Sequence, residues 1–304
     1  MGKNTYVAVG NKEDLSDLIT NIAPYDTPIY SMIGKTTAIA TFHEWLEDDL
    51  GGNPAANKKK EGFEYTVTDP GTRTRLGNYT QIMSRGYGVT DTQEVVQKHG
   101  LSSEIAYHMA NAMKLIALDV EYAYLNNASR VAGDASTERE MGGFPYWIST
   151  NVKSNEPNTP GTHVPRDLTF DLIGEALEDT WKEGGNPTTM IVSPRTKRII
   201  GKLTASQATK NMDADETRLK ERIDVIETDF GTLKIVVDRW MENGKAYIID
   251  PSLWKTAYLR PFKTLDLPKT GDAIKKVIVG ELTIEARAEQ ANAAIIDLLA
   301  TFPE

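Results

Sequence analysis

The 304-residue sequence contains no cysteine. The chain can therefore form neither a disulfide nor a thiolate metal site, and it offers no cysteine nucleophile. It also lacks a run of about 18 consecutive apolar residues, which a membrane-spanning helix would need. Its first residues have no apolar stretch of the kind found in secretory signal peptides. We expect a soluble protein that is made in the cytoplasm and does not bind a membrane.

The chain has fewer basic than acidic residues. Acidic side chains outnumber basic ones by 43 to 34, and the formal net charge is -9. A protein whose main task is to grip nucleic acid needs a concentrated positive surface. The basic run Lys58-Lys59-Lys60 lies in a polar stretch, and we interpret it as a solvated loop. Any contact with DNA is expected to be weak and local.

Motifs for catalysis or ligand binding are scarce as well. Gly34-Lys35-Thr36 resembles the end of a phosphate-binding loop, but Ile29 stands where the motif requires its first glycine. Asp229-Phe230-Gly231 copies three letters of the kinase signature, yet the chain has no His-Arg-Asp triplet. The four histidines lack the spacing of a zinc protease. The sequence predicts no catalytic residue, no metal site and no cofactor.

The apolar pattern changes along the chain and favours an α+β fold. Residues 1–41 include an apolar ribbon interrupted by prolines. Residues 42–91 are strand-like at both ends of a polar middle, which is typical of a long hairpin. Apolar side chains then recur at helical spacing from Ile105 to Ala123, after Ser102 or Ser103 as N-cap. This spacing predicts a long helix over residues 102–127.

From residue 167 onward, after a loop-rich stretch, helices and strands alternate. A helix is expected to begin at Asp167 or Thr169 and to end at Gly184-Gly185. Ser193-Pro194 has the N-cap and the first-turn proline that open a second helix. The long polar connection 204–221 indicates a contact loop. Short strands are expected at residues 189–192, 223–228, 233–238, 246–249, 256–259, 263–267, 275–286 and 293–299.

The ribbon and the hairpin have little apolar surface with which to fold by themselves. Ordering one residue costs about 1–2 kcal/mol of backbone entropy, and an isolated two-stranded hairpin is marginal in water. Burial against a neighbouring subunit offsets this cost at about 25 cal/mol per Å² of apolar surface. We therefore expect these segments to contact other copies of the chain. The side chains expected at such contacts are Ile22, Pro24, Tyr25, Ile29, Tyr30, Met32, Ile33, Phe42, Trp45, Phe63 and Tyr65.

A series of short blocks, taken in order, resembles a known family. The blocks are NIAPYDTPIYSMIG, HEWLEDDL, NYTQI, LDVEYAYLNN, WKEGG, IVSP, VIETDFG and IIDP. In this order the chain is similar to the major capsid proteins of tailed bacteriophages with the Hong Kong 97 fold. More narrowly, it resembles the SU-ten-like major head protein family. The resemblance extends over nearly the whole chain and depends on many blocks, not on one diagnostic motif.

The resemblance implies a division of the chain into parts. Residues 1–41 would be an N-terminal arm, and residues 42–91 an extended loop that lies across an adjacent subunit. Residues 92–166 would form a peripheral domain with a long spine helix. Residues 167–257 would form the axial domain, and residues 258–304 the strands that return to the peripheral domain. The expected product is an icosahedral virion head, built from pentamers and hexamers, that encloses double-stranded DNA.

The implied partners are copies of the same chain. A separate scaffold, a portal and decoration proteins are further candidates. The lysine crosslink of the founding member cannot be matched to Lys58, Lys59 or Lys60, so no covalent crosslink is expected. Two alternatives stay open: an encapsulin-like bacterial shell, which shares the fold without packaged DNA, and a soluble enzyme with an unrecognised site.

Overall fold

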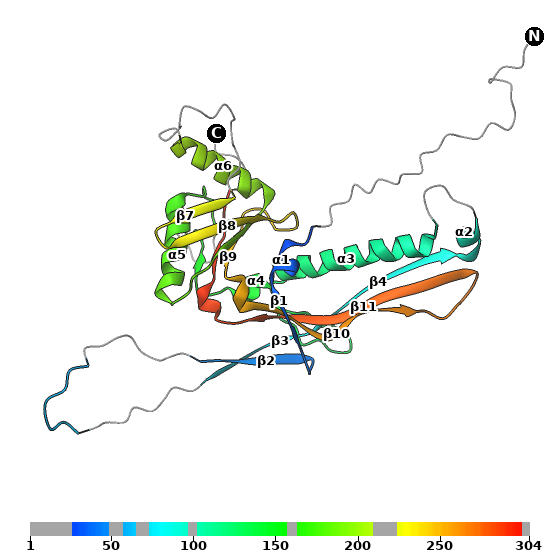
Figure 1. The fold of residues 1–304 in the computed structure, drawn as a ribbon, viewed down its shortest axis with the longest axis horizontal. Coiled ribbons are helices and arrows are strands. Elements are labelled where there is room, and N and C mark those ends of the chain that lie inside the picture. The colour runs from blue at the N-terminus through cyan, green and yellow to red at the C-terminus, as the bar shows by residue number, and fades with distance from the viewer. Residues whose placement is uncertain are drawn as a thin grey trace, which may run out of the picture. The chain divides into compact units, whose positions relative to one another are not determined.

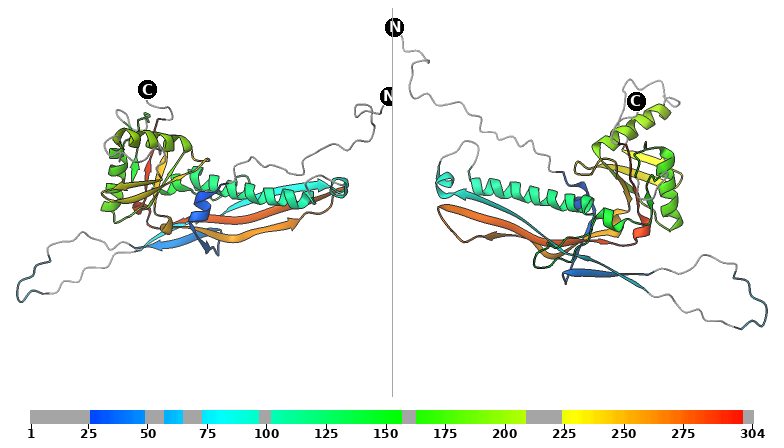
Figure 2. Two further views of the ribbon diagram at one scale, coloured as in Figure 1. Left: turned by 45° about the horizontal axis from the view of Figure 1, so that its top comes forward. Right: turned by 180° about the vertical axis from the view of Figure 1, so that it is seen from behind.

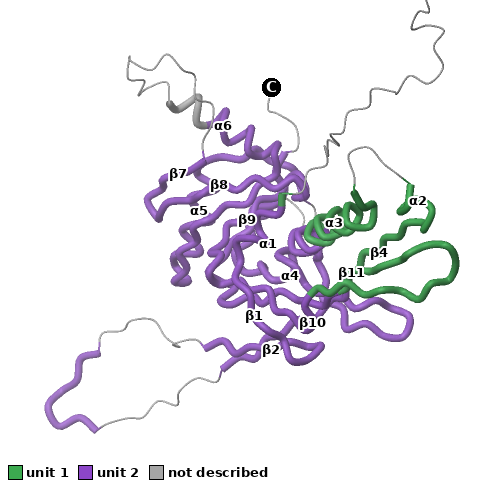
Figure 3. Tube along the Cα trace, turned by 45° about the vertical axis from the view of Figure 1, so that its right-hand side comes forward, with its two compact units in different colours: residues 1–26, 84–118, 262–279 green, residues 27–83, 119–261, 280–304 purple. Residues whose placement is uncertain are grey.

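The computed structural model describes residues 26–48, 57–64, 73–96, 102–156, 163–208 and 224–299 (Figure 1). The chain divides into two compact units, which are coloured separately in Figure 3. The first unit holds residues 84–118 and 262–279, and the second holds residues 27–83, 119–261 and 280–304. Within the described ranges, no helix is both long enough and apolar enough to cross a membrane.

Helices and strands are interspersed throughout the described chain, which confirms the α+β class. In chain order they are α1 (Pro28–Met32), β1 (Gly34–Thr37), β2 (Phe42–Glu47), β3 (Thr74–Tyr79), β4 (Gln81–Thr90), α2 (Asp91–Val95), α3 (Glu104–Asn126), α4 (Phe144–Trp147), β5 (Val152–Lys153), α5 (Phe170–Lys182), β6 (Thr189–Val192), α6 (Pro194–Ala208), β7 (Val225–Thr228), β8 (Gly231–Val237), β9 (Ala246–Ile249), η1 (Pro251–Leu253), β10 (Trp254–Asp266), β11 (Ala273–Ala286), η2 (Glu289–Ala291) and β12 (Ala293–Ile295).

The second unit contains a six-stranded sheet in the order β5-β12-β9-β6-β8-β7. Strand β6 runs parallel to β8 and antiparallel to β9, and β7 pairs antiparallel with β8. Alternate side chains on these strands point to one face, as the two-residue period of a strand requires. Helices α5 and α6 pack against this sheet (Figure 2). On that face the side chains form one apolar cluster with both helices, whose members include Leu172, Ile173, Met190, Val192, Ile200, Ile235, Ile248 and Ile295.

The other face of this sheet is covered by aromatic side chains. Tyr247 of β9 lies with its ring centroid 5.7 Å from that of Phe144, and Phe144 in turn lies 4.5 Å from Trp254. Both pairs have the edge-to-face orientation that the ring quadrupoles favour. Helix α4 therefore packs against the second face of the sheet at β9.

Two further sheets complete the architecture. A four-stranded sheet has the order β1-β10-β11-β4, and β2 pairs with β3 in a two-stranded antiparallel hairpin. Strand β1 is parallel to β10, with Gly34 opposite Lys255. Strand β10 is continuous through Pro261, where the sequence predicts two separate strands.

The first unit contains α2 and the beginning of α3. The N-cap of α3 is Ser103, whose hydroxyl accepts a hydrogen bond from Ala106 N at 3.3 Å, as predicted. The Glu94 carboxylate at the end of α2 accepts hydrogen bonds from the Ser103 hydroxyl at 2.7 Å and from Glu104 N at 3.0 Å. These bonds satisfy amide donors that a helix start leaves unpaired. The apolar stripe of α3 is buried at Ala112 and Ile116.

Several predicted boundaries agree with the structure. The strands at residues 189–192 and 246–249 are confirmed at both ends, and α5 begins after Thr169, whose hydroxyl caps Leu172 N. The last strand is shorter than predicted. Strand β12 ends at Ile295, and Asp297 shortly afterwards has a φ of 60°, a region that interrupts an extended strand.

Residues 28–37 differ from the predicted ribbon, because they form α1 and β1 within the second unit. Pro28 opens α1, where its missing N–H costs nothing. Ile29 is 0% exposed and Ile33 is 3% exposed. The chain itself covers both side chains. Residues 1–25 of the expected arm lie outside the described ranges.

Replacing Ile116 by aspartate tests the assignment of the buried stripe of α3. The side chain is 3% exposed, and an unpaired buried charge costs several kcal/mol against a typical total stability of about 5–15 kcal/mol. We expect Ile116→Asp to abolish soluble folding, as judged by yield and circular dichroism. The neighbouring Leu115 is 44% exposed, so Leu115→Asp is the matched control and should fold. Equal yields of folded protein would contradict the assignment.

Candidate functional site at the base of the β2–β3 hairpin

Buried polar side chains hold one end of the β2–β3 hairpin. Its strands pair from Phe42 opposite Tyr79 to Glu47 opposite Thr74. Buried polar side chains are concentrated at the first of these ends, where Asn78 and Thr80 are both 0% exposed. At the other end Leu46 is 62% exposed. Figure 1 shows the two strands leading away from the other sheets of the second unit. We call the anchored end the hairpin base.

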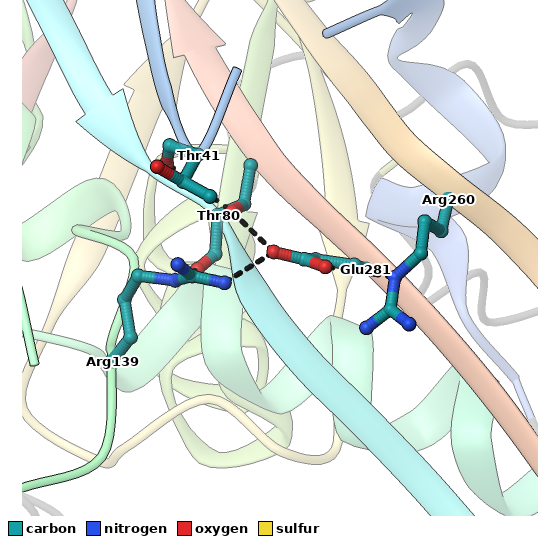
Figure 4. Close-up of polar contacts among 5 residues, drawn as sticks. All are labelled: Thr41, Thr80, Arg139, Arg260 and Glu281. Carbon is teal, nitrogen blue, oxygen red and sulfur yellow. Dashed lines mark hydrogen bonds and ion pairs between the residues drawn. The ribbon is translucent and has the colours of Figure 1, made fainter. Parts of the chain in front are cut away.

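The centre of the hairpin base is the buried carboxylate of Glu281 on β11 (Figure 4). One carboxylate oxygen, Oε1, accepts a hydrogen bond from the Thr80 hydroxyl at 2.7 Å and another from Arg139 Nη2. The other oxygen, Oε2, accepts from Arg260 Nε at 2.9 Å. Arg139 Nε also donates to the Thr80 carbonyl at 2.6 Å, and Thr80 N donates to the Thr41 carbonyl at 2.8 Å. Segments distant in sequence are thereby joined at one carboxylate.

The amide side chain of Asn78 forms a second connection. Its Nδ2 donates to the carbonyls of Gly142 and Ile284, both at 2.9 Å, and its Oδ1 accepts from Gly142 N at 2.9 Å. Both amide protons and the oxygen are thus used, which a fully buried amide requires. These bonds fix β3 to β11 and to the segment that leads into α4.

An arginine also covers the hairpin base from outside. The Arg130 guanidinium donates to the Gly77 carbonyl and lies 5.6 Å from the ring centroid of Phe42 and 5.3 Å from that of Tyr146. Gly77 is required by packing, because a Cβ there would be 2.7 Å from the Phe42 ring. The positive charge over two aromatic faces adds cation–π attraction to the hydrogen bond.

Further along β2, the hairpin contacts the body through Trp45 and His43. The Trp45 and Trp147 ring centroids are 5.1 Å apart. His43 Nε2 lies 3.4 Å from the carboxylate of Glu285, which also accepts from Arg287 Nε at 2.6 Å. Glu285, like Glu281, is a buried glutamate on β11. Two buried carboxylates on one strand therefore hold the hairpin.

A third buried carboxylate holds α1. Glu121 of α3 is 0% exposed and accepts hydrogen bonds from Ile29 N at 2.7 Å and Tyr30 N at 2.8 Å. The Tyr30 hydroxyl is hydrogen-bonded to the Tyr258 hydroxyl at 2.5 Å. Burial raises the pKa of Glu121 to about 8, the neighbouring Asp238 carboxyl adds to the rise, and the two amide donors only partly oppose it. Near neutral pH the Glu121 side chain is therefore mostly protonated.

The structure describes seven of the residues expected at contacts between copies. Ile29, Ile33 and Trp45 are buried in the chain itself, while Tyr30, Met32 and Phe42 are half-buried. Phe63 is 40% exposed. The remaining members of the set, Ile22, Pro24, Tyr25 and Tyr65, lie outside the described residues.

The hairpin base itself was not apparent in the sequence. Its bonds join residues that are far apart, such as Thr80 and Glu281 with a separation of 201 positions, and no local spacing indicates such a pair. One signal was available: Glu281 and Glu285 interrupt an otherwise apolar strand. Charged side chains are almost never fully buried unless they are paired, so a glutamate in such a strand indicates a buried partner.

Comparison with known proteins places this arrangement in a family. Residues 2–299 match the family model described as SU10 major capsid protein. The major capsid protein of Escherichia phage Phieco32 is 22% identical, with coverage of 96% of this chain and 95% of that protein. Among solved structures, the capsid asymmetric unit of cyanophage A-1(L) has a TM-score of 0.70 at 13% identity and covers 97% of this chain and 98% of its own. The holo-SrpI encapsulin complex of Synechococcus elongatus PCC 7942 has a TM-score of 0.59 at 10% identity, covering 97% and 96%.

The match over nearly the whole length decides the class. The chain belongs to the SU10 major capsid protein family. It is a major capsid protein of a phage and a structural component of the virion, with a fold of the Hong Kong 97 type. Like other proteins of this class, it associates with copies of itself. The resemblance to tailed-phage capsid proteins is confirmed.

Replacing Arg139 by methionine tests the hairpin base. Removing one partner of a buried ion pair typically costs about 3–5 kcal/mol, and Glu281 would retain only Arg260 as its cationic partner. We expect a loss of this size in the free energy of unfolding, measured by urea denaturation. The control is Arg75→Met, since the Arg75–Glu44 pair on the hairpin is exposed and such pairs contribute about 0–1 kcal/mol. Equal losses for both variants would show that Glu281 does not anchor the hairpin.

The raised pKa of Glu121 predicts a pH dependence of stability. The folded protein binds the Glu121 proton more tightly than the unfolded chain, whose pKa is near the ordinary value of 4.5. Stability should therefore fall as pH rises from about 4.5 to about 8, with a slope of at most about 1.4 kcal/mol per pH unit from this group. Urea midpoints between pH 5.5 and 8.5 should show a flatter slope for Glu121→Gln than for the natural chain. The exposed Glu242→Gln is the control, and an unchanged slope in Glu121→Gln would contradict the assignment.

Proposed function

We propose that the chain assembles as pentamers and hexamers into an icosahedral head that encloses double-stranded DNA. The observation that carries the proposal is the match of residues 2–299 to one capsid protein family. The capsid structure of cyanophage A-1(L), which covers 97% of this chain, supports it through the fold. The net charge of -9 favours a subunit that holds its neighbours and touches the packaged DNA only weakly.

The β2–β3 hairpin is proposed to lie across an adjacent copy. Its base is fixed by Asn78, Thr80 and Glu281, whereas Leu46 and Phe63 further along are exposed. A hairpin with a fixed base and an exposed apolar side chain such as Leu46 further along suits a contact that spans two subunits, because the base sets its direction before the partner arrives. The partner then supplies the apolar burial that an isolated hairpin lacks.

The remaining parts receive roles by the same reasoning. Residues 167–257, which contribute most of the six-stranded sheet, are proposed as the axial domain. The peripheral domain is proposed to comprise residues 92–166 with α3 as its spine, together with residues 258–304. Residues 1–25 are proposed to contact a neighbouring copy through Ile22, Pro24 and Tyr25. A separate scaffold, a portal and decoration proteins are proposed as further partners.

An encapsulin-like shell is the second candidate, because the encapsulin of Synechococcus elongatus has a similar fold. Packaged DNA separates the two functions. Particles purified from infected cells should contain DNA that resists added nuclease, and electron microscopy should show them as filled heads. Closed particles that never contain DNA would instead support the encapsulin-like function.

Deleting residues 1–25 tests whether the N-terminal segment serves assembly. This deletion keeps α1, whose amides occupy Glu121, so circular dichroism should show a folded protein. Light scattering should show capsomers or monomers in place of closed shells. Deleting residues 1–40 also removes α1 and leaves the buried Glu121 without its donors, so this longer deletion should lower the urea midpoint as well. Normal shells from the shorter deletion would refute the assembly role of residues 1–25.

A further inference from the structure

One hollow of the second unit is lined by acidic side chains. It encloses about 630 Å³ between the first turns of α5 and the β7–β8 turn. Its acidic lining comprises Asp171, Glu175, Glu178, Glu227 and Asp229, and we call it the acidic groove. Its apolar lining includes Phe170, Val225 and Phe230. Beside it, Trp181 is 61% exposed, and its ring centroid lies 6.1 Å from that of Phe230.

Most of these carboxylates have no cation beside them. Glu178 pairs with Lys182 at 2.8 Å. Within the described part of the chain, Asp171, Glu175, Glu227 and Asp229 form no ion pair. Like charges gathered around one hollow repel one another, and a cationic partner would relieve this repulsion. The exposed tryptophan at the rim adds an apolar contact of the kind enriched at protein interfaces.

A second hollow of the same unit has the opposite charge. It encloses about 390 Å³ and is lined by Pro194, Arg195, Arg198, Arg239, Met241 and Asn243. We call it the arginine hollow. Two of its arginines lie in the first turns of α6, where the helix dipole already contributes partial positive charge. An anionic partner is therefore favoured here, and planar guanidinium groups suit carboxylates in particular.

The two hollows lie toward opposite ends of strand β8. The β7–β8 turn, Asp229-Phe230, directly precedes Gly231 at the start of β8, while Arg239 follows Val237 at its end. Parallel strand β6 ends beside β8, which brings the start of α6 to the same end as Arg239. At about 3.3 Å per residue, a strand of seven residues spans roughly 20 Å. The hollows are therefore too far apart to contact each other within one copy.

We propose that the acidic groove of one copy binds the arginine hollow of the next copy around a capsomer. This inference rests on the proposed function, because it names the surfaces by which capsomers form. Two different patches that complement each other make a head-to-tail contact, and repetition of such a contact closes a ring. The apolar side chains at the groove give the contact area, while the charges set its orientation and exclude a contact between like patches.

Charge reversal on each side tests the pairing. The groove variant is Asp171→Lys with Glu175→Lys, and the hollow variant is Arg198→Glu with Arg239→Glu. All four side chains are exposed, so both variants should fold, as checked by circular dichroism. Native mass spectrometry should show loss of pentamers and hexamers for each variant. The control is Glu183→Lys, an exposed position just beyond the end of α5 and outside the groove lining, and it should leave the rings intact.

Mixing the two variants gives a sharper test. In an alternating ring, each reversed groove meets a reversed hollow and each natural groove meets a natural hollow, so every contact is again between opposite charges. Alternation is possible only in rings with an even number of copies. The mixture should therefore recover hexamers but not pentamers, while a chain that carries all four reversals should recover both.

Three outcomes would overturn the inference. If rings persist in either variant alone, the charges do not hold the contact. If the mixture of the two folded variants forms no hexamers, the two hollows do not pair. Loss of DNA retention in the hollow variant, with rings intact, would assign the arginines to nucleic acid. The natural chain is tested alongside the variants. If the natural chain forms no ring or shell, the proposed function fails. If the natural chain forms rings and the variants form them equally well, only the proposed pairing of the two hollows is rejected.

Discussion

The buried carboxylate of Glu281 is the interaction on which the architecture of the hairpin depends. It receives Thr80 from the junction of β3 and β4, Arg139 from the loop after α3, and Arg260 from β10. A charge with so little exposure is tolerated only because donors surround it. Because all of these donors must be in place together, the base of the hairpin can adopt only one orientation on the subunit. The hairpin therefore has a defined origin on the body of the subunit.

A polar anchor differs from an apolar one in what it specifies. Apolar contacts such as Trp45 on Trp147 contribute free energy roughly in proportion to buried area and tolerate small shifts. The bonds of Asn78 and Thr80, in contrast, are satisfied in one register only. A segment that must meet a neighbour at a distance gains from such fixed geometry, because an angular error at its base grows along its length. Buried charge here favours precision of placement over stability.

A buried carboxylate also holds α1, but its surroundings differ. Glu121 also holds a distant segment, through the amides of Ile29 and Tyr30, but a second carboxyl, Asp238, takes the place of an arginine beside it. Burial and the neighbouring Asp238 carboxyl raise the pKa of Glu121 to about 8, although the two amide donors of α1 oppose the rise. The chain thus attaches the hairpin through ion pairs and α1 through backbone amides that donate to a carboxyl with a raised pKa.

The sequence by itself determined the elements whose signals are local. The helix of α3 follows from apolar spacing and the Ser103 cap, and strands such as 189–192 follow from short apolar runs between turn residues. The blocks shared with capsid proteins also lie within short stretches, so the family was recognisable as well. Tertiary structure decided what depends on distant partners: that Ile29 and Ile33 are covered by their own chain, and that Glu281 anchors the hairpin. Periodicity records which residues are apolar, but a buried ion pair across 201 positions leaves no local pattern, because only the folded chain brings its members together.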